Sequence, residues 1–216
     1  MKKILYSITL ILTNLILIIS CKKEDLGIKY GKGVTDIIGN NYKTVIIGKQ
    51  EWMAENLRTT KYNDGGTIPN VTNDDQWSQY NIEGAWCYYD NDIKNDSLFG
   101  KLYNWDAVNT CKLCPTGWHV PTEIEWEDLS DYLESNGYIR NDGSAIKSIS
   151  GWYRNGNGTD NYGWNGLPGG FRNGLGGFDQ IEKSGNWWSS SNELSSNAWY
   201  FYLNSNDLNI KNYQIK

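Results

Sequence analysis

Residues 151–177 consist mostly of glycine, asparagine and aromatic residues, and this stretch limits the possible folds more than any other. Glycine and asparagine tolerate positive φ angles, and Asn and Asp side chains close turns on their own backbone. We therefore expect long ordered loops here instead of a long helix. The whole chain contains 11 Trp and 15 Tyr. So many aromatic residues argue against disorder.

Short strands are expected elsewhere in the chain. Runs of β-branched and aromatic residues bounded by Gly and Asn predict strands at 42–47, 85–89, 186–190, 198–203 and 208–215. Short helices are expected at 102–108 and 142–149. Strands that alternate with few helices favour an α+β domain over βαβ units.

One helix has clear end signals. Thr122 can cap it and Glu125 completes a capping box, while Gly137 ends it. The side chains spaced to form its buried stripe are Ile124, Leu129, Tyr132 and Leu133, with Trp126 covering a flank.

The first 21 residues carry export signals. Lys2 and Lys3 precede a mostly apolar run from Ile4 to Ile19, and Ser20 stands before Cys21. This order is typical of a signal peptide. A small residue before a cysteine resembles the lipobox of bacterial lipoproteins, in which Cys21 would carry diacylglycerol. The alternative is a transmembrane anchor, but this run spans only about 24 Å of a ~30 Å hydrocarbon core.

We therefore expect three segments: a signal peptide at 1–20, a lipidated N-terminus and tether at 21–33, and one domain at 34–216. Residues 22–25 lack the aspartate that retains some lipoproteins in the inner membrane, and they look like the surface-export tag of Bacteroidetes lipoproteins. The expected location is the outer membrane, facing outward, with the membrane as a partner through the lipid. Without Lys2 and Lys3, 18 basic residues face 25 acidic ones, a net charge of −7. Nucleic acid is therefore not an expected partner.

The remaining cysteines are Cys87, Cys111 and Cys114, so at most one internal disulfide can form. The spacing of Cys111 and Cys114 also suits zinc or redox chemistry. Zinc needs four ligands, however, and the chain has no second CxxC and only one histidine, His119. A structural disulfide or an idle thiol is the expectation.

Aromatic residues in the loop stretch suggest a carbohydrate site. Sugars stack their apolar faces on aromatic rings, while Asn and Asp bind the hydroxyl groups. The candidate ligand-binding residues are Trp152, Tyr153, Asp160, Asn161, Trp164 and Asn165. The alternative is that these rings, with Tyr162, fill the core of a loop-rich fold. Trp187, Trp188 and Trp199 lie in expected strands and are predicted to be core.

No cofactor and no metal are assigned. Residues 90–96 offer short oxygen side chains for calcium, but Lys94 stands where an EF-hand needs its third ligand. A solvated acidic loop is therefore preferred, and calcium has no supporting motif. For catalysis, His119 is the only histidine available to a Ser-His or Cys-His pair, and no nucleophile-elbow, Walker or HExxH motif occurs. We expect a non-catalytic protein.

Three groups of segments carry a family resemblance. The first is QEWMAENLRTTKY at 50–62. The second joins YNW at 103–105 to LCPTGWHVPT at 113–122 and EW at 125–126. The third joins LPGGFR at 167–172 to WWSSS at 187–191 and AWY at 198–200.

Together these segments resemble the Fibrobacter succinogenes major paralogous domain of exported Bacteroidetes and Fibrobacteres proteins. This family looks related to the C-type lectin-like fold that also houses formylglycine-generating enzymes. The resemblance implies an α+β, C-type lectin-like domain with short antiparallel strands, one or two helices and long ordered loops. It also implies structural roles for Trp118, His119, Pro121, Thr122 and Glu125.

One departure from the family concerns the C-terminus. Family members usually close with a strand containing Gly-Phe-Ser-Val-Arg-Cys, and this sequence stops at Lys216 without it. We expect a missing last strand to leave a sheet edge unpaired and Cys114 without a partner.

The expected function is a lipid-anchored, non-catalytic binding or adhesion module at the cell surface, with a glycan or another surface polymer as its ligand. One alternative is a structural cell-envelope protein whose aromatic residues all belong to the core. The other is an enzyme with an unrecognised site.

Overall fold

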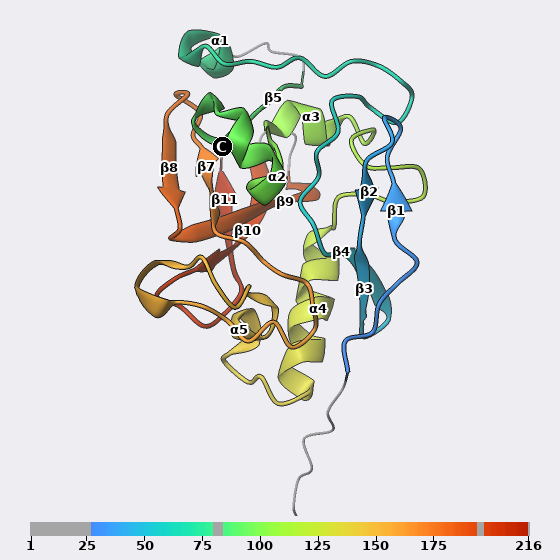
Figure 1. The fold of residues 1–216 in the computed structure, drawn as a ribbon, viewed down its shortest axis with the longest axis vertical. Helices are drawn as coiled ribbons and strands as arrows, with labels where there is room; N and C mark the ends of the chain where they lie inside the picture. Colours follow the sequence, from blue (N-terminus) through green and yellow to red (C-terminus); the bar gives the residue numbers. More distant parts are fainter. Residues whose placement is uncertain (1–26, 80–83, 194–196, 216) are drawn as a thin grey trace, which may run out of the picture.

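A five-stranded sheet in the order β11-β10-β9-β7-β8 is the largest element of the structure (Figure 1). The structure is a computed structural model that describes residues 27–79, 84–193 and 197–215. The predicted signal peptide and Cys21 lie outside the described residues. Within the described part, no helix has the length and apolar character needed to cross a bilayer.

The strands of this sheet come from the last third of the chain. They are β7 (Gly169–Arg172), β8 (Phe178–Ile181), β9 (Ser184–Glu193), β10 (Asn197–Asn204) and β11 (Lys211–Ile215). Most neighbours are antiparallel, but β7 and β9 meet in parallel through the pair Gly170 and Gly185. A Cβ on Gly170 would lie 2.5 Å from the carbonyl oxygen of Asp179, and one on Gly185 would lie 2.4 Å from that of Leu167. A side chain at either position would therefore collide with a neighbouring backbone.

Three two-stranded ladders precede the large sheet. They are β1 (Val34–Thr35) with β2 (Asn41–Tyr42), β3 (Thr44–Ile47) with β4 (Gln50–Met53), and β5 (Trp86–Cys87) with β6 (Leu102–Tyr103). The expected strands at 42–47, 85–89, 186–190, 198–203 and 208–215 therefore all occur, with shifted ends.

The folded region begins earlier than the predicted boundary at residue 34. Tyr30 forms a β-bridge with Val45, and the Gly31 amide donates to the Thr44 carbonyl at 2.9 Å. On the other side of this bridge, the Ile46 amide donates to the Lys29 carbonyl at 2.7 Å. Residues 29–31, which the sequence places in the tether, thus lie along the free edge of β3.

The helices are short except for one. They are α1 (Asp74–Ser78), α2 (Asp96–Phe99), α3 (Trp105–Asn109), α4 (Glu123–Ser135) and α5 (Asp142–Ile146), with 3-10 turns at Tyr89–Asn91, Ile93–Asn95 and Tyr153–Asn155. The predicted capping box of α4 is confirmed, because Thr122 and Glu125 exchange both hydrogen bonds. The chain forms a mixed α+β domain, as expected.

The predicted buried stripe of α4 is partly wrong. Trp126 is 2 % exposed and packs with Leu129 and Leu133, whereas Ile124 is 69 % exposed. Helical geometry explains the difference, since three and seven residues separate Trp126 from the two leucines and keep all three on one face. Ile124 precedes Leu129 by five residues, which turns it toward solvent.

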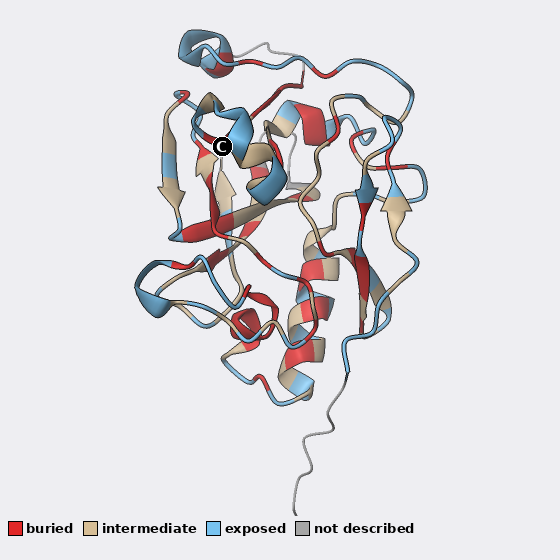
Figure 2. Ribbon diagram, viewed as in Figure 1, coloured by how far each residue is buried: buried red, intermediate tan, exposed pale blue. Residues whose placement is uncertain are grey.

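The main core lies between α4, the β3–β4 hairpin and the large sheet (Figure 1). Buried residues follow one side of α4 and occupy all of α5 (Figure 2). Trp126 is at the centre, stacked on Phe201 at 5.0 Å between ring centroids and tilted against Trp52 at 4.9 Å. The aromatic residues of this fold therefore fill its interior.

Candidate functional site

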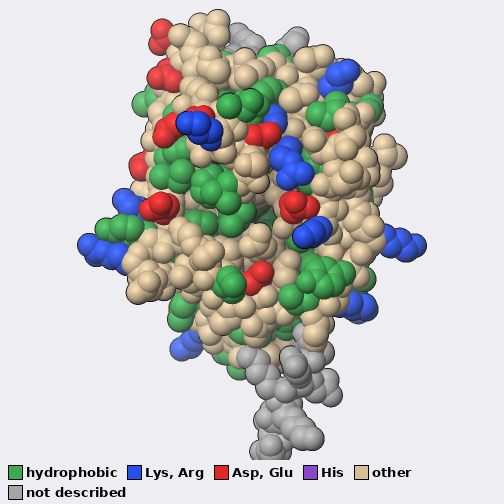
Figure 3. Space-filling view, viewed as in Figure 1, with side chains coloured by type: hydrophobic (Ala, Val, Ile, Leu, Met, Phe, Trp, Pro, Cys, Tyr) green, Lys and Arg blue, Asp and Glu red, His purple; other side chains and the backbone are tan. Residues whose placement is uncertain are grey.

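A cavity of about 800 Å³ opens on the surface, and we call it the groove. Its walls come from β4 and the residues after it to Leu57, from 99–108, from 113–126, from 164–174, and from Trp187 and Trp188 of β9. Figure 3 shows a hollow near the middle of one face, with hydrophobic side chains beside it. A volume of this size is typical of a site for a small molecule or a short oligomer.

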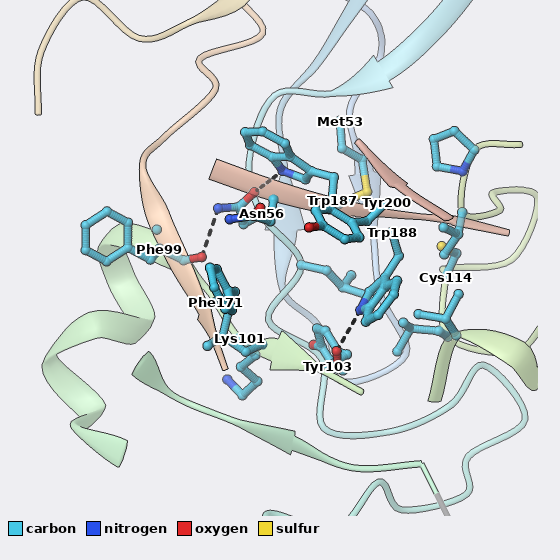
Figure 4. A pocket seen from close by; sticks show the side chains of 18 of the residues that line it. Met53, Asn56, Phe99, Lys101, Tyr103, Cys114, Phe171, Trp187, Trp188 and Tyr200 are labelled. Carbon is cyan, nitrogen blue, oxygen red and sulfur yellow. Dashed lines mark hydrogen bonds between the residues drawn. The ribbon is translucent and has the colours of Figure 1, made fainter. Parts of the chain in front are cut away.

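Trp187 and Asn56 form one side of the groove. The Trp187 indole Nε1 donates to Asn56 Oδ1 at 3.1 Å, and Asn56 Nδ2 donates to the Phe99 carbonyl at 2.9 Å (Figure 4). Trp187 also packs against Trp164 at 4.8 Å between ring centroids. Asn56 thereby fixes the ring orientation of Trp187, which is half-buried.

Trp188 is held in a similar way. Its Nε1 donates to the Tyr103 carbonyl at 2.8 Å (Figure 4). The Tyr103 hydroxyl in turn donates to the Thr59 carbonyl at 2.7 Å. The centroid of the Trp188 ring lies 5.6 Å from that of Trp105 and 6.2 Å from that of Tyr200. These rings are half-buried. The groove therefore has a preorganised aromatic lining.

One of the buried cations that line the groove, Lys101, is neutralised within the protein. The Lys101 ammonium lies 2.7 Å from Asp96 Oδ1, with only 4 % of its side chain exposed. The same ammonium lies 4.9 Å from the Trp86 ring centroid and 5.0 Å from that of Tyr88. Lys101 therefore orders the wall rather than offering a free charge.

Carboxylates at the groove are also engaged in structural contacts. Glu51 accepts from the Thr44 hydroxyl at 2.6 Å, and Glu55 accepts from the Lys43 amide at 2.6 Å. Burial raises the pKa of Asp106 above its ordinary value. Glu51 and Glu55 are therefore held in place by a neighbouring hydroxyl and by the backbone.

The three cysteines that the structure describes are free thiols. Burial raises the pKa of Cys114, which lines the groove, to about 12. For Cys87, burial raises the pKa to about 11, partly opposed by Arg172. Both therefore stay protonated at neutral pH and are poor nucleophiles. Of the two outcomes left open by the sequence, a disulfide or an unpaired thiol, the structure has unpaired thiols at all three of these positions.

The residues given structural roles by the resemblance lie where α4 begins. Trp118, His119, Pro121 and Glu125 all line the groove. Glu125 accepts from the Thr122 amide at 2.8 Å and lies 2.8 Å from His119 Nε2. Burial raises the pKa of Glu125, but these hydrogen bonds outweigh it and lower the pKa below its usual value. This network fixes the chain as it enters the helix.

The two tryptophans of the predicted carbohydrate loop lie in the core. Trp152 is 4 % exposed and Trp164 is 6 % exposed, and both belong to the main aromatic cluster. Trp152 Nε1 donates to Ser148 Oγ at 2.9 Å. Sugar stacking needs an exposed ring face, so the structure favours the alternative in which these rings fill a loop-rich core. Tyr162, 9 % exposed, is also part of this cluster.

The other predicted ligand-binding residues are dispersed. Asn165 is exposed and lines the groove beside Trp164. Tyr153 is 41 % exposed and lines a different cavity. Asn161 donates to the Tyr138 hydroxyl, and Asp160 accepts from the Asn165 amide at 2.8 Å. The structure thus does not bring the six predicted residues together as one surface.

Asp160 makes folding stability depend on pH. Burial raises its pKa to about 6, although backbone amides of Asn165 and Trp164 partly oppose this shift. Between the ordinary value of 3.8 and 6 the folded state binds more protons than the unfolded state, so stability falls as pH rises through this window. We expect Asp160→Asn to raise the free energy of unfolding by about 1–2 kcal/mol at pH 7.5 and to change it little at pH 3.5.

Urea denaturation at the two pH values measures this effect. The matched control is Asp131→Asn, which makes the same change at an exposed position of α4. Equal responses of both variants, or a gain at pH 3.5 as large as at pH 7.5, would contradict the role given to Asp160.

No group of three or more His, Cys, Asp or Glu side chains is placed to hold a metal ion in the part of the chain that the structure describes. In the loop at 90–96, Asp92 Oδ1 accepts from the Lys94 amide at 3.0 Å, while Asp96 pairs with Lys101. These carboxylates therefore serve the local backbone and the groove wall.

The main residues of the groove were missed by sequence reasoning. Trp187 and Trp188 were predicted to be core because they lie in a strand, yet both are half-buried and line the groove. No local sequence pattern marked Asn56 as part of a site, because its hydrogen-bond partner Trp187 lies far away in the sequence. The WWSSS segment could have indicated Trp187 and Trp188, since it is one of the segments on which the family resemblance rests. The resemblance implied no role for it, however.

Comparisons with known proteins identify the family. No curated protein matches the chain, and no solved structure matches it. The family model described as the Fibrobacter succinogenes major domain matches residues 45–215. This range covers most of the chain and includes every segment on which the resemblance rests. The chain therefore belongs to the Fibrobacter succinogenes major domain family.

Proposed function

We propose that this protein is a non-catalytic glycan-binding module displayed on the cell surface by a lipid on Cys21. The observation that carries the proposal is the groove, in which Trp105, Trp187 and Trp188 offer half-buried rings. Hydrogen bonds from both β9 indoles to other segments hold the rings in place. A ligand would not have to immobilise these side chains, which lowers the entropic cost of binding.

A sugar fits this lining better than a purely apolar ligand. Asn104, Asn165, Asn173 and Asn186 lie among the aromatic rings of the groove. Aromatic rings stack on the C–H faces of pyranoses, and amides bind hydroxyl groups. Binding without turnover is supported by Glu51 and Glu55, which are engaged in structural contacts. It is also supported by Cys114, which is protonated and therefore a poor nucleophile.

A C-type lectin-like fold is part of this proposal. It is supported by the resemblance of the segment that opens α4 and by the combination of a curled sheet with long ordered loops. The glycan class follows from chemistry of the groove and not from the fold, because one fold can serve many functions.

The test is a glycan-array screen of the protein with and without calcium. We expect selective binding that Trp105→Ala and Trp188→Ala weaken at least tenfold. Tyr30→Ala is the control, since Tyr30 is 64 % exposed and lies outside the groove. Circular dichroism establishes that each variant is folded. A folded wild-type protein that binds no glycan would refute the proposal and favour a structural envelope role, while release of cleaved sugar would favour an enzyme.

The lipid anchor has a separate test. We expect Cys21→Ala to leave an unlipidated precursor that still carries residues 1–20, because the variant lacks the thiol to which the diacylglycerol would be attached. Metabolic labelling with a fatty acid measures the loss of lipid, and the mass of the protein measures the retained signal peptide. Cys111→Ala, at an exposed cysteine, is the control. Normal labelling and normal processing of Cys21→Ala would contradict lipidation at this residue.

A further inference from the structure

A second cavity, of about 410 Å³, opens beside Tyr153 and shares no lining residue with the groove. It is lined by Tyr153, Arg154, Gln180, Lys183 and residues 204–206, and we call it the basic cavity. Its charged lining residues are one arginine and one lysine, although the chain as a whole carries a net charge of −5.

The side-chain cations of Arg154 and Lys183 both lie close to the ring of Tyr153. The guanidinium carbon of Arg154 lies 5.1 Å from the Tyr153 ring centroid, and the Lys183 ammonium lies 5.6 Å from it. The ring face carries partial negative charge, which attracts a cation placed over it. Tyr153 therefore holds two positive charges near each other without neutralising either.

Carboxylates do not compensate these charges. Neither Arg154 nor Lys183 forms an ion pair within residues 27–79, 84–193 and 197–215. Glu182 contributes its backbone carbonyl, which accepts from the Tyr153 amide at 2.7 Å. Asp207 lies 3.6 Å from Lys211, outside the cavity lining.

A third cation lies beneath the cavity wall. Lys147 is 1 % exposed, and its ammonium donates to the carbonyls of Asn204 and Asp207 at 2.9 Å each. Burial lowers the pKa of Lys147, partly opposed by Asp207. Lys147 thus braces the 204–207 turn that forms one wall and adds to the positive field there.

The backbone around the cavity is strained. Arg154, Asn155, Gln180 and Glu182 all have φ between 50° and 64°, a region that favours glycine. A non-glycine residue in this sparsely populated conformation is strained, and such residues tend to occur at functional sites.

We propose that the basic cavity binds an oxyanion, a carboxylate or a sulfate group. The planar guanidinium of Arg154 can donate two parallel hydrogen bonds to such a group, and Lys183 supplies a second positive charge. Asn204, Ser205 and Asn206 add polar residues to the lining. Because this site is separate from the groove, it stands whether or not the groove binds a glycan.

Isothermal titration of the full chain at low ionic strength tests this site. The probes are inorganic sulfate, sodium glucuronate and, as the uncharged control, glucose. The variant is Arg154→Gln with Lys183→Gln. The matched control is Arg140→Gln with Lys94→Gln, which removes the same charge from two exposed residues outside the cavity. Arg140 also has a positive φ, of 55°, so the control repeats the backbone setting of Arg154.

We expect saturable millimolar binding of sulfate and glucuronate by the wild type and the control, and at least tenfold weaker binding by the cavity variant. If glucuronate binds more tightly than sulfate, the natural source of the bound group is an acidic sugar. If the two bind with equal affinity, the source is a free inorganic anion. No saturable binding, unchanged affinity in the cavity variant, or glucose binding as tightly as glucuronate would overturn the proposal. Trp105→Ala is expected to leave this binding unchanged, so failure here and failure of the groove are distinguishable.

Discussion

Trp126→Ala is expected to lower the free energy of unfolding by about 3–5 kcal/mol, the range for truncating a large buried aromatic residue. Trp126 is 2 % exposed and contacts aromatic rings from several directions. It stacks on Phe201 at 5.0 Å and lies 4.9 Å from Trp52, 5.8 Å from Trp164 and 6.5 Å from Trp187. Truncation would therefore leave a cavity where α4, the β3–β4 hairpin and the large sheet meet.

The control for this variant is Ile124→Ala on the same helix. Because Ile124 is 69 % exposed, we expect a change of about 0.5 kcal/mol or less. Urea denaturation followed by circular dichroism measures both variants. A larger loss for Ile124→Ala than for Trp126→Ala would mean that α4 faces the core with the stripe predicted from the sequence.

Arg172→Met is expected to cost about 3 kcal/mol or more, because it leaves buried carbonyl groups without donors. The Arg172 side chain is fully buried, and it donates to the carbonyls of Val71 at 2.6 Å, Thr72 at 3.2 Å and Gly176 at 2.8 Å. Its guanidinium carbon also lies 4.4 Å from the Trp77 ring centroid. Methionine keeps much of the stem but supplies no donor.

Thermal and urea denaturation measure this loss. Arg140→Met is the matched control at an exposed position, where we expect a change of about 0.5 kcal/mol or less. Arg172→Lys restores one donor and is expected to fall between the wild type and Arg172→Met, since lysine cannot reproduce the planar fork. Equal stability of Arg172→Met and Arg140→Met would show that Arg172 does not tie β7 to residues 71–74.

Local signals in the sequence predicted much of the secondary structure. The capping box of Thr122 and Glu125 placed α4 within a residue of its start, because capping depends on neighbours only three positions apart. The face of α4 was harder to predict. Choosing between Ile124 and Trp126 requires the position of the other layers, and hydrophobic character alone does not distinguish them.

The groove could not be predicted from the sequence. The Trp187–Asn56 hydrogen bond joins residues 131 positions apart, and the Trp188–Tyr103 bond joins residues 85 positions apart. No local pattern encodes such pairs. In contrast, Trp152 and Trp164 stand among Asn and Gly residues that suggest an exposed loop, yet the fold turns both rings inward. Trp152 and Trp164 thus follow the core alternative rather than the sugar site, whereas Trp187 and Trp188, predicted to be core, line the groove.

The most direct test of the proposed function is the response of the tryptophan indole N–H signals to sugars. The protein, labelled with nitrogen-15, is titrated with cellohexaose, xylohexaose, mannohexaose and chitohexaose while its proton–nitrogen spectrum is recorded. If the groove binds glycans, at least one sugar shifts the Trp187 and Trp188 signals in a saturable manner and leaves the buried Trp152 signal in place. Unchanged Trp187 and Trp188 signals with all four sugars, or a shift confined to other tryptophans, would contradict the glycan-binding groove.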